Sequence, residues 1–151
     1  ATASALTDGA AVTLICEENF AKQNKLEIYG RIKSTAIEGC DPNFMGLGPI
    51  SATKKALKRA NLSINDIDIV ELNEAFASQS LACMRGLGVA DDSEIVNPNG
   101  GAIALGHPLG MSGARLALTS SIEIHSKKID YGLCTMCVGV GQGISMITAR
   151  V

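Results

Sequence analysis

Residues 97–115 are the part of this sequence best suited to chemistry, because five glycines and two prolines surround one histidine, His107. A flexible linker would contain more Ser, Lys or Glu. Glycines among small apolar residues are typical of a buried loop whose backbone approaches a ligand closely. In such a loop His107 could donate a hydrogen bond to developing negative charge or move a proton. Alternatively, it only helps to hold a tight loop together.

Cys134 and Cys137 form a Cys-x-x-Cys pair near the C-terminus. A zinc site would need two more ligands, and a redox pair of this spacing usually opens a helix, whereas this pair ends an expected strand. We therefore predict no metal site. Cys137 adjoins the glycine turn 139–143, where backbone N–H groups can face an oxyanion, so it is the favoured nucleophile or base. Cys134 is expected to pack as a small hydrophobic residue.

Asn73-Glu74 lies where an expected strand meets a helix, and on its own it could be an ordinary N-cap. However, Asn73, His107 and Cys137 each follow a predicted strand or lie at its end. In an α/β sheet such positions gather at one edge, where ligands bind. We therefore expect an amide, an imidazole and a thiol to line one pocket.

Apolar runs that alternate with helical patterns predict an α/β domain closed by an antiparallel hairpin. The expected strands are residues 10–18, 26–37, 67–72, 131–138 and 143–151. The expected helices are residues 20–24, a helix that begins near residue 50, 75–87 and 111–125.

Composition and charge exclude several classes of protein. The 151 residues fit one domain, and a net charge of −2 leaves no basic stripe for nucleic acid. No apolar run approaches the roughly 20 residues that span a bilayer. Five irregularly spaced cysteines form no disulfide framework, which favours the cytoplasm. The chain starts at Ala1 without an initiator Met, so we expect it to be the interior of a longer protein.

These motifs together resemble the C-terminal half of a thiolase over essentially all 151 residues. Residues 133–137 and Val140 are most similar to the 3-oxoadipyl-CoA thiolase branch, with acetyl-CoA acetyltransferases as related enzymes. The matching motifs are Asn73-Glu74-Ala75-Phe76, Gly106-His107-Pro108 and Cys137-x-Gly139, supported by residues 8–11, 45–49 and 97–102.

The resemblance implies a role for each matching residue. Cys137 would be the acid/base that exchanges a proton with the acetyl-CoA α-carbon. His107 would activate the nucleophilic thiol and donate to the thioester oxygen in one oxyanion hole, where Asn73 holds a water. The N–H of Gly139 would serve the second hole.

CoA contacts are implied for Ser4 and Phe76. CoA and acyl-CoA are then substrates, and no further cofactor is implied.

The resemblance also implies a thiolase-fold C-terminal domain over residues 1–151, with a mixed sheet of about five strands flanked by helices. Its partner would be the thiolase N-terminal domain, which carries the nucleophilic cysteine, in a homodimer or homotetramer. No nucleic acid or membrane partner is expected, and the isolated chain should be inactive. The alternatives are a non-catalytic packing module descended from thiolase and a decarboxylating condensing enzyme. Cys137 argues against the latter, which uses two histidines, or His and Asn, instead.

Overall fold

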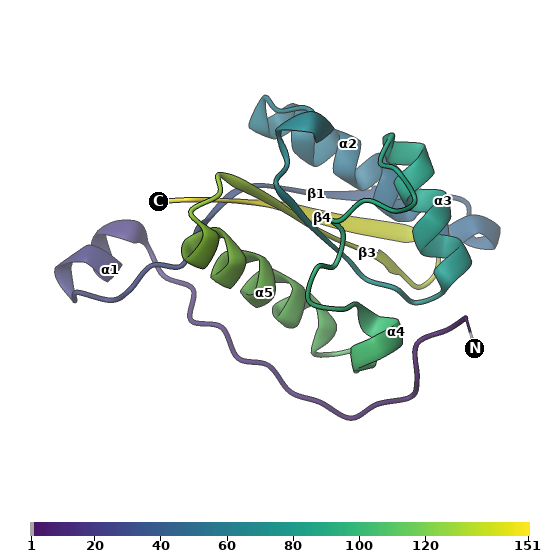
Figure 1. The fold of residues 1–151 in the computed structure, drawn as a ribbon, viewed down its shortest axis with the longest axis horizontal. Helices are drawn as coiled ribbons and strands as arrows, with labels where there is room; N and C mark the ends of the chain where they lie inside the picture. Colours follow the sequence, from purple (N-terminus) through teal and green to yellow (C-terminus); the bar gives the residue numbers. More distant parts are fainter. Residues whose placement is uncertain (1) are drawn as a thin grey trace.

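A four-stranded mixed sheet forms the centre of the protein in a computed structural model that describes residues 2–151 (Figure 1). Ala1, where the predicted domain begins, lies outside the described residues. The strand order is β1-β4-β3-β2. Three neighbours, β1 (Arg31–Gly39), β4 (Gln142–Ala149) and β3 (Tyr131–Val138), are antiparallel, and β2 (Ile69–Leu72) runs parallel to β3. The predicted α/β class and closing hairpin are confirmed.

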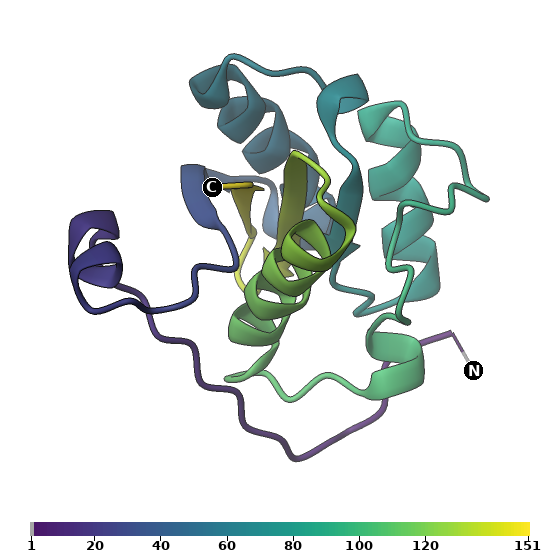
Figure 2. The same cartoon turned by 60° about the vertical axis from the view of Figure 1, so that its left-hand side comes forward.

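Helices cover both faces of the sheet (Figure 2). α2 (Gly48–Ala60) and α3 (Ala77–Leu87) lie on one face, and α5 (Ser112–Lys127) lies on the other. The short helices are α1 (Glu18–Gln23), α4 (Ala102–Leu105), η1 (Pro42–Leu47) and η2 (Ile64–Asp66). Within residues 2–151, no helix is both long and apolar enough to cross a membrane.

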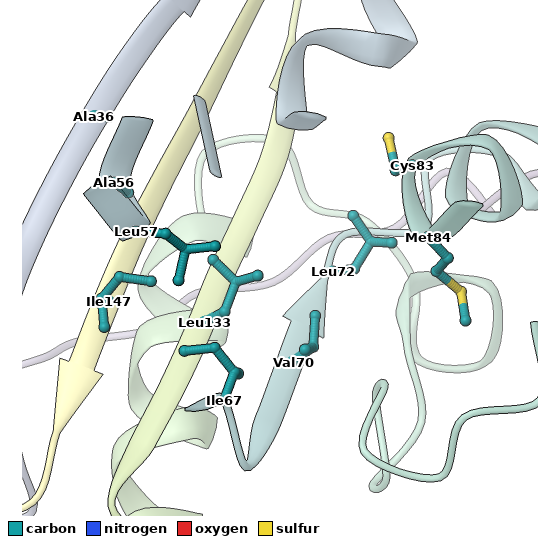
Figure 3. Packing of buried hydrophobic residues seen from close by; sticks show 10 residues of the cluster. All are labelled: Ala36, Ala56, Leu57, Ile67, Val70, Leu72, Cys83, Met84, Leu133 and Ile147. Carbon is teal, nitrogen blue, oxygen red and sulfur yellow. The ribbon is translucent and has the colours of Figure 1, made fainter. Parts of the chain in front are cut away.

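The main hydrophobic core lies between the sheet and the α2–α3 layer (Figure 3). Val70 and Leu72 of β2 point into this core, together with Leu133 and Ile147 of the neighbouring strands. Side chains alternate along a strand, so Ile69 and Glu71 point to the opposite face of the sheet, toward α5. All four residues of β2 are buried. A strand covered on both faces reads as a nearly continuous apolar run, which is why its position was predictable.

The predicted strand at residues 10–18 is wrong. In the structure most of this segment lies outside any helix or strand, and its last residue begins α1. It runs along the outside of the molecule, and the exposed fractions of Val12, Leu14 and Ile15 are 89%, 75% and 73%. An apolar run indicates a segment that favours burial, but a strand also needs a hydrogen-bonding neighbour. No strand of the described chain pairs with it, so the sheet has four strands instead of about five.

The β3–β4 turn contains a strained residue. Val140 has a φ of 61° and is followed by Gly141 at 85°. The left-handed region suits glycine, and it costs a residue with a Cβ roughly 1–2 kcal/mol, most severely when the side chain is β-branched. The Val140 side chain is 83% exposed, so little burial offsets this strain.

We therefore expect Val140→Gly to raise the free energy of unfolding by about 0.5–1 kcal/mol, after allowance for the extra freedom of glycine in the unfolded chain. Urea denaturation monitored by circular dichroism measures the change. The matched control is Val138→Gly, which replaces a valine within regular strand β3 and should lower stability. A lower stability for Val140→Gly would show that the turn is not strained.

Candidate functional site

Asn73 directly follows β2 and is completely buried. Its backbone N–H donates to the carbonyl of Thr135 over 3.0 Å, so the pairing with β3 continues past the strand. The side-chain Nδ2 lies 3.2 Å from Nε2 of His107. The other amide atom, Oδ1, is buried with no hydrogen-bond partner among residues 2–151. The structure therefore confirms that Asn73 and His107 come together, and it leaves one acceptor of the amide free for another molecule.

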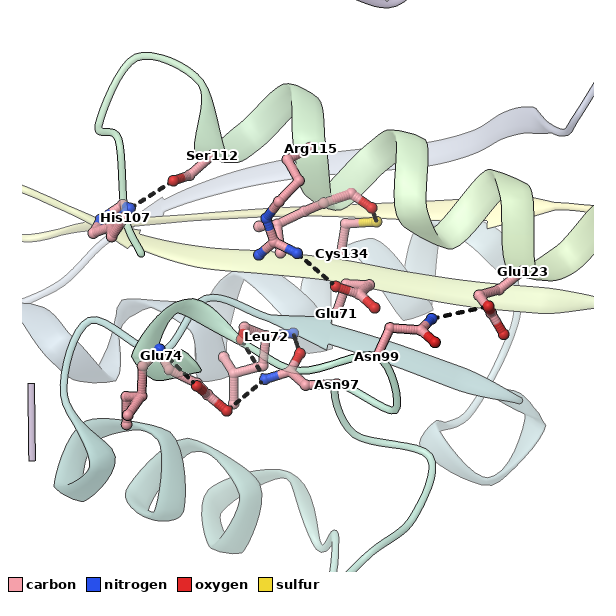
Figure 4. Close-up of polar contacts among 12 residues, drawn as sticks. Glu71, Leu72, Glu74, Asn97, Asn99, His107, Ser112, Arg115, Glu123 and Cys134 are labelled. Atoms are coloured by element: carbon pink, nitrogen blue, oxygen red, sulfur yellow. Dashed lines mark hydrogen bonds and ion pairs between the residues drawn. The ribbon is translucent and has the colours of Figure 1, made fainter. Parts of the chain in front are cut away.

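Hydrogen bonds determine which nitrogen of His107 carries its proton, and Figure 4 shows the one to Ser112. An amide nitrogen can only donate, so Nε2 accepts from Asn73. On the other side of the ring, Nδ1 lies 2.6 Å from Oγ of Ser112, whose hydroxyl donates to the carbonyl of Pro108 over 3.0 Å. Nδ1 must then donate to Ser112. The ring is therefore a neutral imidazole with a lone pair on Nε2, which can accept a proton.

The electrostatic surroundings favour the same form. Burial lowers the pKa of His107 below its ordinary value, and the positive charge of Arg115 lowers it further. Both effects disfavour the imidazolium ion. Around pH 7 His107 is therefore a base that can accept a proton.

Two side chains fix the loop that leads to His107. Asn97 accepts from Leu72 N–H over 2.9 Å and donates to Leu72 C=O over 2.8 Å, so its side chain takes the place of a neighbouring strand. Its Nδ2 also donates to Glu74 over 3.0 Å, and the second oxygen of Glu74 accepts from the N–H of Ile103 over 3.0 Å. A Cβ at Gly101 would lie 2.2 Å from Cδ of Glu74, so a larger residue there would displace this carboxylate. The loop is thus held by four hydrogen bonds, of which the two to Leu72 are buried.

Cys137 lies at the end of β3, at the same edge of the sheet as Asn73. Alternation places it on the face that α2 covers, because Thr135 contacts Thr53 of α2 and Met136 lies beside Gly113 of α5. His107 reaches the edge from the α5 side, through Ser112. No hydrogen bond of the described residues joins Cys137 to His107, so the predicted convergence of the thiol with the other two groups stays a prediction.

Burial raises the pKa of the Cys137 thiol, so the resting group is protonated. Gly139 lies in the turn two residues later, and a Cβ built on it would meet no atom within 4 Å. The space beside this glycine is open. Cys134 packs against α5, where its Sγ lies 3.4 Å from the carbonyl of Leu116, and burial raises its pKa to about 12. Its predicted role as a small hydrophobic residue agrees with this environment.

The N-terminal segment lies against the site. Ser4 N–H donates to the carbonyl of Ala75 over 3.1 Å, its hydroxyl contacts the same oxygen at 3.3 Å, and Ala3 pairs with Phe76. Farther along, a Cβ at Gly106, next to His107, would lie 2.3 Å from Oγ1 of Thr7. The structure thus places Ser4 next to the motif that begins at Asn73 and ends at the half-exposed Phe76.

Sequence reasoning missed several residues that the structure places at the site. Ser112 orients His107, Asn97 anchors the loop, and Arg115 contacts the buried Glu71. One signal was available, because a glutamate inside the apolar run 67–72 must find a partner when that run is buried. Within residues 2–151, no group of three or more His, Cys, Asp or Glu side chains could hold a metal ion.

Comparisons with known proteins agree with this geometry. The family model described as "Thiolase, C-terminal domain" matches residues 26–150. The chain is 58% identical over 149 residues to the 3-oxoadipyl-CoA/3-oxo-5,6-dehydrosuberyl-CoA thiolase of Escherichia coli K12. This alignment covers 99% of the chain and 37% of the E. coli protein. The chain is also 56% identical over 149 residues to a 3-ketoacyl-CoA thiolase of Photobacterium profundum, and this alignment covers 98% of the chain and 38% of that relative.

The crystal structure of human mitochondrial 3-ketoacyl-CoA thiolase superimposes with a TM-score of 0.84 and 43% identity, covering 89% of this chain and 34% of that one. The chain thus spans less than two fifths of the length of these curated relatives.

The anchoring role of Asn97 can be tested by removing its side chain. Asn97 has a φ of 48°, which glycine also adopts, so Asn97→Gly keeps the backbone and leaves both buried polar groups of Leu72 without partners. We expect it to lower the free energy of unfolding by about 2–4 kcal/mol, measured by urea denaturation.

The matched control is Asn61→Gly, because Asn61 has a φ of 57° at the C-cap of α2 and its side chain hydrogen-bonds to no other described residue. That variant should change stability by less than about 0.5 kcal/mol. Equal losses in the two variants would contradict the anchoring role.

Proposed function

The chain belongs to the thiolase family as its C-terminal domain, and from this we propose that it serves in acyl transfer between acyl-CoA and CoA. The reaction would be the condensation of two acyl-CoA molecules or the thiolytic cleavage of a 3-oxoacyl-CoA. The proposal rests on the chain of hydrogen bonds from Asn73 through His107 to Ser112, which lies at the sheet edge where Cys137 also lies. A packing module has no need of a half-buried imidazole held in one tautomer with its basic nitrogen toward an amide.

We propose that His107 activates a nucleophilic cysteine supplied by the N-terminal domain. The lone pair on Nε2, released from its contact with Asn73, would take the thiol proton, and the thiolate would attack the carbonyl carbon of the thioester. The resulting Nε2–H would then donate to a thioester oxygen, together with a water held by Asn73. The free Oδ1 of Asn73 supports this role, since a buried acceptor without a protein partner suits an ordered water.

Cys137 would exchange the proton of the substrate α-carbon. In cleavage, its thiol would protonate the departing acetyl-CoA carbanion, and the protonated resting state suits this step. In condensation, the thiolate would remove the α-proton, while the N–H of Gly139 stabilises the oxyanion of the acyl-enzyme. A substrate lying across the sheet edge would have His107 on its α5 side and Cys137 on its α2 side.

The remaining assignments follow from the same proposal. Ser4 and Phe76 would contact CoA, because they lie together beside the Asn73 motif and Phe76 is half exposed. CoA and acyl-CoA would be the only small molecules required. The partner would be the N-terminal domain, within a homodimer or homotetramer in the cytoplasm. The exposed apolar side chains of Leu6, Val12 and Leu14 support a partner, since a surface of this kind is usually covered.

A chimera tests this function. It joins the part of the Escherichia coli relative that this chain does not match to residues 1–151. We expect CoA-dependent cleavage of a 3-oxoacyl-CoA by the chimera and none by the chain alone. Cys137→Ala and His107→Ala should each lower kcat by about 10²–10⁴-fold, because each removes a group that moves a proton in the reaction.

The matched control is Cys134→Ala, which removes a thiol of the same strand that packs against α5, and its kcat should stay close to that of the parent. Circular dichroism verifies that each chimera is folded, and a chimera that misfolds is replaced by co-expression of its two parts as separate chains. A folded protein without thiolysis would favour the non-catalytic module, and near-normal turnover in Cys137→Ala would remove its role. Rates with 3-oxoadipyl-CoA and with straight-chain 3-ketoacyl-CoA decide the acyl specificity.

A further inference from the structure

We propose that Arg115 and Glu71 are positioning residues for His107, because their contact fixes the first turn of α5, and with it the loop of His107, against β2. This inference rests on the proposed function for its kinetic consequence only. Its physical basis is a second polar link between the same two elements that hold His107.

Glu71 is the unusual member of β2. It is completely buried in a strand whose other residues are apolar, and it lies two positions before Asn73. Both side chains therefore project from the α5 side of the sheet. Oε2 of Glu71 lies 3.3 Å from Nη1 of Arg115 (Figure 4).

Arg115 follows Ser112 by three positions in α5, so the two side chains lie on the same side of the helix. The first turn of α5 is thus tied to β2 twice, by the chain through His107 and by the contact of Arg115 with Glu71. A shift of α5 along β2 would break both links. The ring of His107 keeps its distance to Asn73 only while α5 keeps its place.

The contact between Arg115 and Glu71 is a poor source of stability. It consists of one hydrogen bond, and Oε1 of Glu71 and Nη2 of Arg115 are buried without a partner among the described residues. A buried pair with free polar atoms seldom recovers the cost of leaving water. What the contact does provide is a second fixed point between α5 and β2.

The charge of this pair depends on pH. Burial raises the pKa of Glu71 to about 7, although Arg115 opposes the rise. The positive charge of Arg115 also lowers the pKa of His107. A second positive charge on the ring is then disfavoured. The titratable and charged groups around the ring and this pair are Glu71 of β2, Glu74 of the following loop, Arg115 and Glu123 of α5, and Cys134 of β3.

The direct test is an NMR titration of His107 in the chain, labelled with ¹³C-histidine. Arg115→Gln should make the ring titrate at a higher pH than in the parent, because the opposing charge is gone. Arg115→Lys keeps a positive charge and should stay near the parent. Glu71→Gln is the matched control, since its amide oxygen can still accept from Nη1 of Arg115 and so keeps the link between α5 and β2. An unchanged titration in Arg115→Gln, or equal shifts in that variant and Glu71→Gln, would overturn the proposal.

The pH profile of the chimera provides a second measurement. In Arg115→Gln the acidic limb of kcat/KM should move to higher pH, so the ratio of activity at pH 6 to that at pH 8 falls by roughly twofold or more relative to the parent. Glu71→Gln should keep the parental ratio. A loss in Arg115→Gln that is uniform across pH would mean a structural role only and would contradict the inference. An inactive parent chimera would instead count against the proposed function, while the NMR titration still decides the role of Arg115.

Discussion

The whole arrangement depends on how β2 ends. Leu72 is the last residue of the strand, and both of its outward backbone groups are satisfied by the side chain of Asn97 instead of by another strand. Buried backbone groups without partners are costly, so this contact specifies where the loop must lie. Glu74 extends the anchor by holding Asn97 and the N–H of Ile103. The glycines of the loop allow the backbone to approach these groups closely, and His107 then meets Asn73.

The site is an edge site approached from two faces. Asn73 follows β2 and Cys137 lies near the end of the neighbouring parallel strand β3, so both lie at the carboxyl edge of the sheet. Alternation sends the thiol to the α2 face, whereas His107 arrives on the α5 side. Approach from two faces suits the proposed reaction. His107 would act on the nucleophile and the thioester oxygen, and Cys137 would act on the α-carbon. A thiol and an imidazole in direct contact would exchange a proton with each other rather than with a substrate.

The success and the failure of strand prediction have one physical explanation. β2, β3 and β4 were placed nearly correctly, because each is buried by helices of this chain and its residues are accordingly apolar. Residues 10–18 are equally apolar, yet most of them lie exposed and unpaired. An apolar composition indicates that a segment favours burial. It does not indicate which element the segment packs against. The segment therefore looks like a strand in the sequence and is not one in the described chain.

The sequence by itself determined the fold class and the closing hairpin, and it singled out Asn73, His107 and Cys137 as candidate site residues, because residue types and glycine spacing are local properties. Only the tertiary structure decided the tautomer of His107, which follows from Ser112 and Asn73 on opposite sides of the ring. It alone also decided the pairing of Glu71 with Arg115, across 44 residues of sequence, and the face from which Cys137 projects. Hydrogen-bond direction and the pKa of a buried group depend on neighbours that are distant along the chain, so no local pattern can specify them.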